Sequence, residues 1–250
     1  EGAPEEEIKE ALILSSRSLV EIEPNYTYAT ARILLDSLRT EALSFLKVKD
    51  NATFAEMKSL YGTSLKAFID KAISLELIDP ELRKMDLEFL GSQIKPERDL
   101  LFSYLGLQTL YDRYFIHSDE VRFELPQVFF MRVAMGLAIA EDNREERAVE
   151  FYNLLSSFDY MSSTPTLFNA GTPHSQLSSC YLTTVPDDLH GIYGALQDNA
   201  MLSKWAGGLG NDWTPVRGMG AHIKGTNGKS QGVVPFLKVV NDTAVAVNQG

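Results

Sequence analysis

Residues 163–171 read Ser-Thr-Pro-Thr-Leu-Phe-Asn-Ala-Gly and mark the place where the pattern of the chain changes. Of the 17 glycines, 12 lie beyond residue 160, in little more than a third of the 250 residues. Before this boundary, apolar residues recur at the spacing of an amphipathic helix. After it, short runs rich in β-branched and aromatic residues alternate with helical patterns and glycine turns, which is typical of α/β folds. We therefore expect a mostly helical region followed by an α/β region.

The helical region should begin each helix at a turn-prone or capping residue. The predicted helices span residues 5–18, 26–46, 53–76, 97–115, 125–140 and 144–157, with breaks at Pro24, Asn51, Asp79-Pro80 and His117-Ser118-Asp119. For the helix opened by Pro96-Glu97-Arg98-Asp99, the predicted apolar stripe is Leu100, Leu101, Tyr104, Leu105, Leu110, Tyr111 and Tyr114. In the α/β region we predict strands at 178–184 and 212–216 and helices at 189–205 and 234–247.

The composition excludes several classes of protein. The net charge is −11, and residues 161–250 hold five basic and five acidic residues, so all the excess acid lies in residues 1–160. An acidic chain is a poor candidate for binding nucleic acid, because phosphate contacts need a basic face. The apolar run 128–140 is interrupted by Arg132 and falls short of the roughly 20 residues of a membrane span. The N-terminus lacks the features of a signal peptide, and we expect a cytoplasmic protein.

Cys180 is the only cysteine and lies in a predicted strand after the turn-prone Gly171-Thr172-Pro173. On composition alone, an isolated cysteine in an apolar strand is a small buried core residue. A redox function requires a second thiol, because two-electron reduction by a cysteine closes a disulfide. Cys180 is therefore either inert or paired with a cysteine outside these 250 residues.

Three further segments suit phosphate or ribose oxygens, although each is also compatible with an ordinary loop. We expect the hydroxyls of Ser163-Thr164-Pro165-Thr166 at the mouth of a strand. Gly207-Gly208-Leu209-Gly210 offers backbone N–H groups, but a predicted helix precedes it, which excludes a Rossmann fold and favours an interdomain turn. Arg217 and Lys224 lie in a flexible stretch, 216–231, where two cations suit a di- or triphosphate. His222 has no second ligand at metal-binding spacing, so we expect no metal site.

Taken in order, five segments resemble the start of the catalytic barrel in the large subunit of aerobic ribonucleotide reductases. They are residues 163–171, Gln-Leu-Ser-Ser-Cys-Tyr-Leu at 176–182, Asp-Asp-Leu at 187–189, Ala-Gly-Gly-Leu-Gly at 206–210 and Val-Arg-Gly-Met-Gly at 216–220. The resemblance implies the end of an ATP cone at 1–23 and a helical N-terminal domain at 24–160. It implies the first part of a ten-stranded α/β barrel at 161–250.

The resemblance also implies the site residues. Those that would hold a ribonucleoside diphosphate substrate are Thr164, Ser179, Cys180 and Gly208. Cys180 would also be one half of the thiol pair that faces the ribose 2′ position. Those that would bind a dNTP or ATP effector are Asp187, Asp188, Leu189, Arg217 and Lys224, although the family often has arginine at the position of Lys224. Gln249-Gly250 matches the beginning of a second effector loop.

In this family a thiyl radical on a later cysteine starts the reaction, and the thiol pair supplies two electrons, which thioredoxin or glutaredoxin restores. The resemblance implies a homodimer that binds no cofactor directly and receives its radical from a metal-containing small subunit. The radical cysteine and the second thiol would lie beyond Gly250, so we expect this chain to be an inactive fragment of a ribonucleoside-diphosphate reductase, an enzyme of deoxyribonucleotide biosynthesis. Two alternatives are a cobalamin-dependent reductase and a nonenzymatic nucleotide-sensing or scaffold module in which Cys180 is only part of the core.

Overall fold

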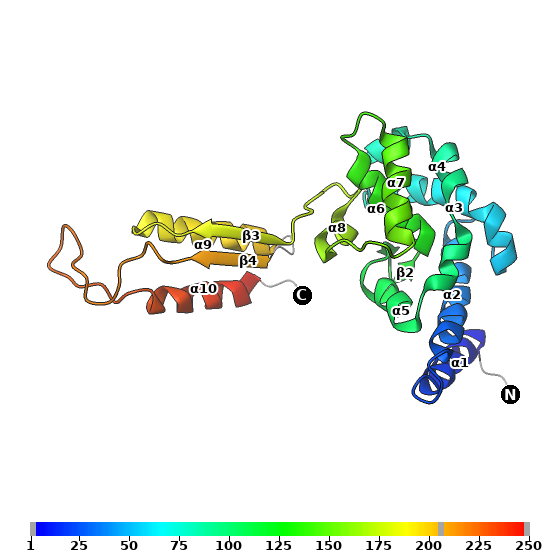
Figure 1. Cartoon of the computed structure of the whole chain (residues 1–250), viewed down its shortest axis with the longest axis horizontal. Coiled ribbons are helices and arrows are strands. Elements are labelled where there is room, and N and C mark those ends of the chain that lie inside the picture. The colour runs from blue at the N-terminus through cyan, green and yellow to red at the C-terminus, as the bar shows by residue number, and fades with distance from the viewer. Residues whose placement is uncertain (1–3, 205–207, 248–250) are drawn as a thin grey trace. The chain divides into compact units, whose positions relative to one another are not determined.

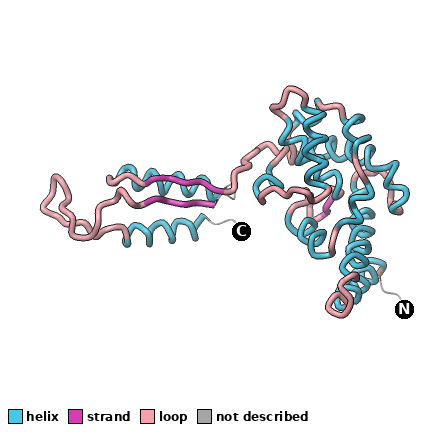
Figure 2. Tube along the Cα trace, viewed as in Figure 1, coloured by secondary structure: helices cyan, strands magenta, loops and turns pink. Residues whose placement is uncertain are grey.

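The computed structural model describes residues 4–204 and 208–247, and their internal contacts form two compact units. The helical unit contains the described residues up to 162 together with 167–175, and the sheet unit contains 163–166 together with those from 176 onward. Figure 1 colours the elements along the chain, and Figure 2 distinguishes helices from strands. Among the described residues, none of the helices combines the length and the apolar character that a membrane span requires.

The helical unit follows the predicted pattern closely. Its elements are α1 (Glu5–Ser18), α2 (Tyr26–Phe45), α3 (Phe54–Ser74), the 3-10 helix η1 (Pro80–Lys84), α4 (Leu87–Gln93), the 3-10 helix η2 (Pro96–Leu101), α5 (Tyr104–Arg113), the antiparallel strands β1 (His117–Ser118) and β2 (Val121–Arg122), α6 (Pro126–Ala138) and α7 (Arg144–Ser156). Thr53 begins α3 with a capping box, in which the Glu56 carboxylate accepts from the Thr53 N–H at 2.8 Å. Five of the six predicted helices are confirmed to within two residues at each end.

The predicted helix 97–115 is wrong, because the structure divides it into η2 and α5. Phe102 between them is extended and buried, and the Ser103 side chain accepts from the Gly106 N–H and begins α5. The predicted apolar stripe is also wrong, since Leu105 is 73% exposed. A capping serine after a buried aromatic residue therefore outweighs an apolar spacing that looked continuous.

Helix α4 was not predicted. Asp86 begins it, and its carboxylate accepts from the Phe89 N–H at 2.9 Å. Gly91 of α4 approaches α3 so closely that a Cβ there would lie 2.9 Å from Cα of Gly62. The short length of α4 and its glycine weaken the helical pattern in the sequence, whereas the packing of two glycines allows the helix to form.

The core of the helical unit contains polar groups that are paired with one another. Arg132 of α6 is fully buried, and its Nε lies 2.7 Å from Oε1 of Glu124, which is also fully buried. The Arg132 Nη1 also donates to the carbonyl of Ala170 at 2.8 Å. Through this hydrogen bond, Arg132 ties α6 to residues 167–175, the last segment of the helical unit.

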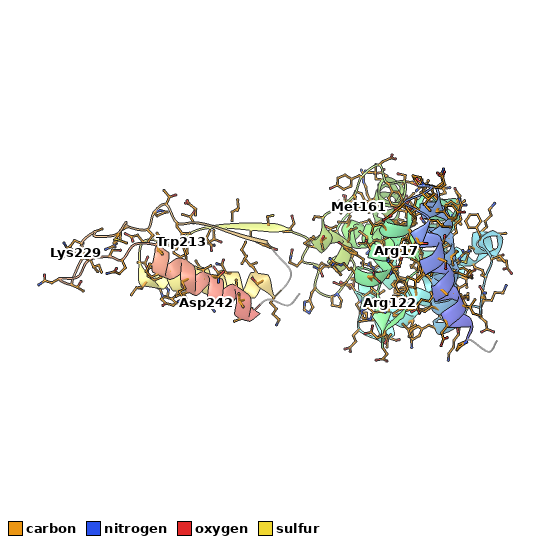
Figure 3. The ribbon with its side chains drawn as sticks, turned by 90° about the horizontal axis from the view of Figure 1, so that it is seen from below. Arg17, Arg122, Met161, Trp213, Lys229 and Asp242 are labelled. Atoms are coloured by element: carbon orange, nitrogen blue, oxygen red, sulfur yellow. The ribbon has the colours of Figure 1, made fainter. Side chains whose placement is uncertain are left out.

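The sheet unit contains two parallel strands and two long helices. Its elements are β3 (Cys180–Thr184), α9 (Leu189–Ser203), β4 (Gly208–Asp212) and α10 (Val234–Val247), and α8 (Thr164–Asn169) straddles the boundary between the units. Cys180 pairs with Gly208 and Thr184 with Asp212 at the two ends of the register. Figure 3 shows α9 and α10 on one side of the sheet. The predicted helix at 234–247 is confirmed, and that at 189–205 is confirmed to Ser203, while Trp205 lies outside the described residues.

The predicted strand at 212–216 is wrong, because β4 precedes it. Asp212 ends the strand, and its carboxylate accepts from the Thr214 N–H at 2.9 Å. The Gly-Leu-Gly sequence of β4 has low intrinsic strand propensity, which hid the strand from sequence analysis. Close packing explains its glycines, because a Cβ at Gly210 would lie 2.7 Å from Cδ2 of Leu182. The expected turn at the glycines is thus wrong for Gly208 and Gly210, while Gly207 lies outside the described residues.

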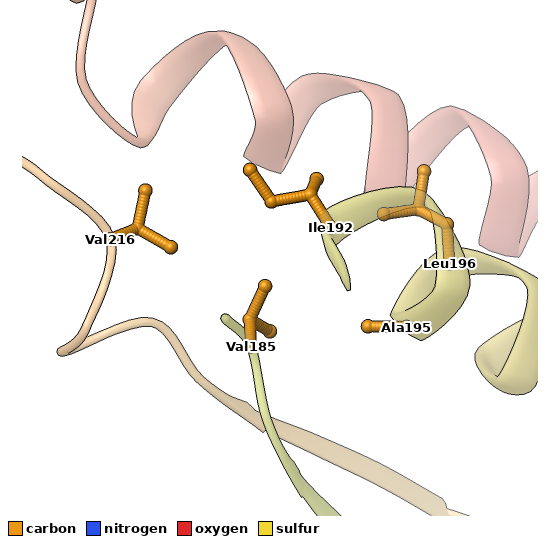
Figure 4. Packing of buried hydrophobic residues seen from close by; sticks show 5 residues of the cluster. All are labelled: Val185, Ile192, Ala195, Leu196 and Val216. Carbon is orange, nitrogen blue, oxygen red and sulfur yellow. The ribbon is translucent and has the colours of Figure 1, made fainter. Parts of the chain in front are cut away.

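The core of the sheet unit is small and joins the end of β3 to α9. Its buried residues are Val185, Ile192, Ala195, Leu196 and Val216, as Figure 4 shows. Trp213 and Phe236 pack beside it with ring centroids 6.4 Å apart. None of the residues of α10 is buried against the described part of the chain.

The stretch expected to be flexible, 216–231, pairs with itself as a hairpin. Backbone hydrogen bonds across it run from Gly220 N–H to Ser230 O at 2.8 Å, from Ser230 N–H to Ala221 O at 2.8 Å and from Ile223 N–H to Gly228 O at 3.1 Å. Gly225 near its tip has φ +87°, a conformation that favours glycine. Figure 3 places Lys229 on this hairpin, away from Trp213. Residues 216–231 therefore have a defined local structure.

Candidate functional site

Cys180 lies at the first position of β3 and its side chain is exposed. The alternative in which Cys180 is a buried core residue is therefore wrong for the sheet unit as the structure describes it. Exposure makes a thiol accessible for exchange with a partner thiol, which a buried core cysteine is not. The position is compatible with redox chemistry.

Gly208 brings β4 against the thiol. Its N–H donates to the carbonyl of Ser179 at 2.8 Å, and a Cβ at this position would lie 2.9 Å from that carbonyl and 3.9 Å from Sγ of Cys180. Any side chain at position 208 would thus push β4 away from β3 or occupy the space beside the sulfur. Three of the predicted substrate residues, Ser179, Cys180 and Gly208, are therefore adjacent.

The thiol faces away from the helices of the sheet unit. Asn211 of β4 exchanges two amide hydrogen bonds with Asn199 of α9, at 2.7 and 3.1 Å, so Asn211 lies on the helical side. Successive residues of a strand alternate between faces, so Cys180 and Gly208 belong to the opposite face. Leu182 on that face is 88% exposed. The thiol thus lies on the open face of the sheet, where few side chains of the sheet unit cover it.

Thr164 is the first residue of α8 and is exposed. The expectation of a strand mouth is wrong here, since residues 164–169 form a short helix with Pro165 in its first turn, where proline is favoured. The hydroxyl of Thr166 donates to the carbonyl of Leu177 at 3.2 Å. This bond places the start of α8 beside the segment that leads into β3.

Asp187 and Arg217, both predicted effector residues, form a multidentate ion pair. The Arg217 Nε lies 3.0 Å from Oδ1 and 2.9 Å from Oδ2 of Asp187, and the Arg217 N–H donates to Oδ1 at 3.0 Å. The guanidinium also donates to the carbonyls of Asp187 at 3.3 Å and His222 at 3.2 Å. These hydrogen bonds hold the pKa of the Asp187 carboxyl below its ordinary value. Both residues were predicted from the sequence, but their contact was not. Nor was the hydrogen bond from Arg217 to the carbonyl of His222.

Asp188 and Leu189 start α9 beside this pair. The Asp188 carboxylate accepts from the Gly191 N–H at 2.8 Å and so caps the helix, and Leu189 is 65% exposed. Gly191 is a residue that sequence analysis missed: a Cβ there would lie 2.7 Å from Cβ and Cγ of Pro186. The signal available was a proline five residues before a glycine in a predicted first turn.

Lys224 lies on the hairpin and is exposed. In the described ranges its ammonium has no hydrogen-bond or ion-pair partner. A cation without a partner, seven residues after Arg217 in the sequence, suits an anionic ligand. The described residues also contain no group of three His, Cys, Asp or Glu side chains that could hold a metal ion. Gln249-Gly250, the predicted start of a second effector loop, lies outside the described residues.

Comparison with known proteins gives consistent matches over both units. Residues 100–175 match the family described as ribonucleotide reductase, all-alpha domain, and residues 178–250 match that described as ribonucleotide reductase, barrel domain. The chain is 54% identical over 250 residues to the ribonucleoside-diphosphate reductase subunit alpha of Chlamydia muridarum. It is 42% identical over 246 residues to the protein of that name from Helicobacter pylori strain 26695, and 39% identical over 230 residues to the ribonucleoside-diphosphate reductase large chain of Schizosaccharomyces pombe.

These alignments cover nearly all of the chain but only part of each relative. They include 100%, 98% and 91% of this chain, against 23%, 30% and 27% of the respective relatives. The chain therefore spans less than a third of the length of the curated relatives it matches.

Proposed function

Because the chain belongs to the ribonucleotide reductase family, we propose that it carries one thiol of the substrate-reducing pair and the effector site of a ribonucleoside-diphosphate reductase large subunit. The observation that carries this proposal is the position of Cys180, an exposed sulfur on the open face of the sheet beside Gly208. The pieces of both functions lie in the sheet unit.

The proposed substrate site holds a ribonucleoside diphosphate with Thr164, Ser179, Cys180 and Gly208. Cys180 faces the ribose 2′ position, and a second thiol outside these residues completes the pair. As the 2′ hydroxyl leaves as water, the two thiols become a disulfide and supply two electrons. Thioredoxin or glutaredoxin then reduces that disulfide by thiol exchange. A radical-generating small subunit with a metal centre would provide the initial oxidising equivalent.

The proposed effector site binds a dNTP or ATP at the interface of a homodimer. Asp187, Asp188 and Leu189 would contact the nucleoside, because a carboxylate accepts hydrogen bonds from a ribose hydroxyl. Arg217 and Lys224 would contact the phosphates. In the same proposal, residues 1–23 end an ATP cone, 24–160 form the helical domain, and 161–250 begin the barrel of a cytoplasmic enzyme.

The redox part of the proposal is tested in the full-length protein. We expect Cys180→Ser to abolish formation of deoxyribonucleoside diphosphate, since a hydroxyl cannot form the disulfide. Thr184→Ala, on the same exposed face of β3, is the matched control and should retain turnover. Turnover must also require the small subunit rather than adenosylcobalamin. Wild-type turnover in Cys180→Ser would disprove the assignment.

The effector part is tested by binding of dTTP to the full-length protein. Arg217→Ala should weaken binding by about tenfold or more, because charge-assisted hydrogen bonds contribute about 1.5–3 kcal/mol. Lys238→Ala, which removes an exposed cation from α10, is the control and should bind as wild type does. If a folded dimer of the wild type does not bind dTTP or dATP, the chain is instead a scaffold module.

A further inference from the structure

The guanidinium of Arg217 faces inward, toward Asp187, rather than toward solvent. Both carboxylate oxygens of Asp187 accept from Arg217, at 2.9 and 3.0 Å, and the carbonyl of His222 takes a further donor. The two side chains are half-buried, 34% exposed for Asp187 and 32% for Arg217. The two groups expected to contact opposite ends of a nucleotide are thus bound to each other in this structure.

We propose that the Asp187–Arg217 pair couples the two ends of the effector site, so that a ligand binds strongly only if it offers an anion to Arg217 and a hydroxyl to Asp187 together. This inference rests on the proposed function and deepens it. The pair makes Asp187 a specificity-determining residue for the intact nucleotide, because each end of the ligand replaces one member of the pair.

Simple charge balance supports the coupling. A polyphosphate alone that withdraws Arg217 leaves the half-buried Asp187 carboxylate unpaired and brings further negative charge near it. A nucleoside alone that withdraws Asp187 leaves the guanidinium unpaired. Separating a partly desolvated ion pair is costly unless both charges find new partners. A nucleoside triphosphate supplies both partners at once.

Lys224 differs from Arg217 in that it has no existing partner to give up. Its ammonium has no partner in the described part of the chain, so it can bind a phosphate without breaking an existing contact. Lys224 therefore contributes general attraction for anions, whereas Arg217 contributes only when Asp187 is satisfied elsewhere.

The pair also holds the base of the hairpin. The backbone N–H of Arg217 donates to Oδ1 of Asp187, so the start of the hairpin is anchored to the segment before α9. Loss of the carboxylate charge weakens both this anchor and the hold on the guanidinium. The hairpin that carries Lys224 and Lys229 should then open more often.

The decisive experiment compares the affinities of the full-length protein for inorganic tripolyphosphate and for dTTP. In Asp187→Asn, tripolyphosphate should bind about tenfold more tightly than to wild type, because Arg217 is released, while dTTP binding should weaken severalfold. Asp212→Asn removes the same charge from the end of β4 and keeps an oxygen for the Thr214 N–H, so it is the matched control. There both affinities should change by the same small factor.

Opposite changes for the two ligands cannot come from misfolding or from the net charge, since these move both affinities together. Equal factors for the two ligands in Asp187→Asn, or weaker tripolyphosphate binding, would overturn the coupling. Absence of dTTP binding to the wild type would count against the proposed function, and the gain of tripolyphosphate binding in Asp187→Asn would still decide the coupling.

A second measurement needs no ligand. Trypsin should cut after Lys224 and Lys229 severalfold faster in Asp187→Asn than in Asp212→Asn, because only the former loses the anchor of the hairpin. Equal cleavage rates in the two variants would show that the pair does not hold the hairpin and would overturn the inference.

Discussion

The two units differ in what lies inside them. The helical unit encloses a fully buried ion pair, Glu124–Arg132, and a buried carboxylate, Asp99, among aromatic and aliphatic side chains. The core of the sheet unit has five buried apolar residues, and α10 buries none of its residues against the described chain. Every predicted site residue lies in the sheet unit. The proposed site residues thus lie in the unit with the smaller core, whereas the helical unit has the large, well-packed core of a stable domain.

The largest expected effect comes from breaking the buried ion pair of the helical unit. Arg132→Met leaves the Glu124 carboxylate buried without its partner and the carbonyl of Ala170 without its donor. We expect the free energy of unfolding of the helical unit to fall by about 3–5 kcal/mol, as for other buried pairs that lose one partner. Urea denaturation followed by circular dichroism measures it.

The exposed pair Arg147–Glu150 on α7 is the control for this comparison. Arg147→Met should change the free energy of unfolding by less than about 0.5 kcal/mol, because exposed pairs contribute little. A similar loss in the two variants would contradict the view that the helical unit depends on its interior.

The next effect is a pH dependence that belongs to the helical unit alone. Burial raises the pKa of Asp99 to about 6 from an ordinary 3.8, although Tyr61 and Gln127 donate to its carboxylate at 2.6 and 2.9 Å. The folded state binds the Asp99 proton more tightly than the unfolded state does, so protonation of Asp99 stabilises the fold. This stabilisation is fully present below the unfolded pKa and is lost as the pH rises through about 6. A difference of about two units corresponds to about 3 kcal/mol.

Asp99→Asn removes this titration. The free energy of unfolding of the variant minus that of the wild type should therefore rise by about 2.5 kcal/mol from pH 4 to pH 7. A constant difference across that range would show that the pKa of Asp99 in the folded state is not raised above its unfolded value.

A smaller effect is expected in the core of the sheet unit. Ile192→Ala removes a large side chain from its five-residue cluster and should cost about 2 kcal/mol, the lower end for such truncations, because a small core can collapse around the gap. Leu38→Ala in α2, where the leucine is fully buried, should cost more. Hydrogen exchange resolved by segment measures each unit separately, and equal losses would contradict the difference between the cores.

The smallest effect compares two glycines of α9. A Cβ at Gly191 would contact Pro186 at 2.7 Å, whereas a Cβ at Gly194 would have nothing within 4 Å. We expect Gly194→Ala to stabilise the sheet unit by up to about 1 kcal/mol through helix propensity. Gly191→Ala should instead destabilise it by about 1 kcal/mol, because the clash outweighs that gain. The sign of the difference, read by thermal unfolding, is the test.

The helices were predictable where a periodic pattern and a cap agree, as in α3 with its capping box at Thr53. Prediction failed where packing replaces propensity. The strand β4 is held by the approach of Gly208 to Ser179, and α4 by the approach of Gly91 to Gly62. A glycine carries no signal of the partner it approaches, so neither element could be predicted from a single chain.

The candidate site shows the same limit. Cys180, Asp187 and Arg217 could be identified as candidate site residues from the sequence segments that contain them. Their contacts were not, because Asp187 and Arg217 are separated by thirty positions and meet only when α9 and β4 fold between them. The assignment of substrate and effector roles to these residues stays a prediction.

The amide pair between Asn199 and Asn211 has a consequence for how the strands align. Parallel strands can slide past each other by a residue, and such a slip would turn Cys180 toward the helices or place a leucine beside its sulfur. Asn199 lies on α9, which follows β3, and Asn211 lies on β4, so the reciprocal amide bonds fix β4 against α9 and, through α9, oppose such a slip. Asn211 lies three residues from Gly208, roughly 10 Å along the strand. A substitution of Asn211 would therefore act on the Cys180 sulfur without contacting it, because it would allow a residue of β4 other than Gly208 to lie opposite Cys180.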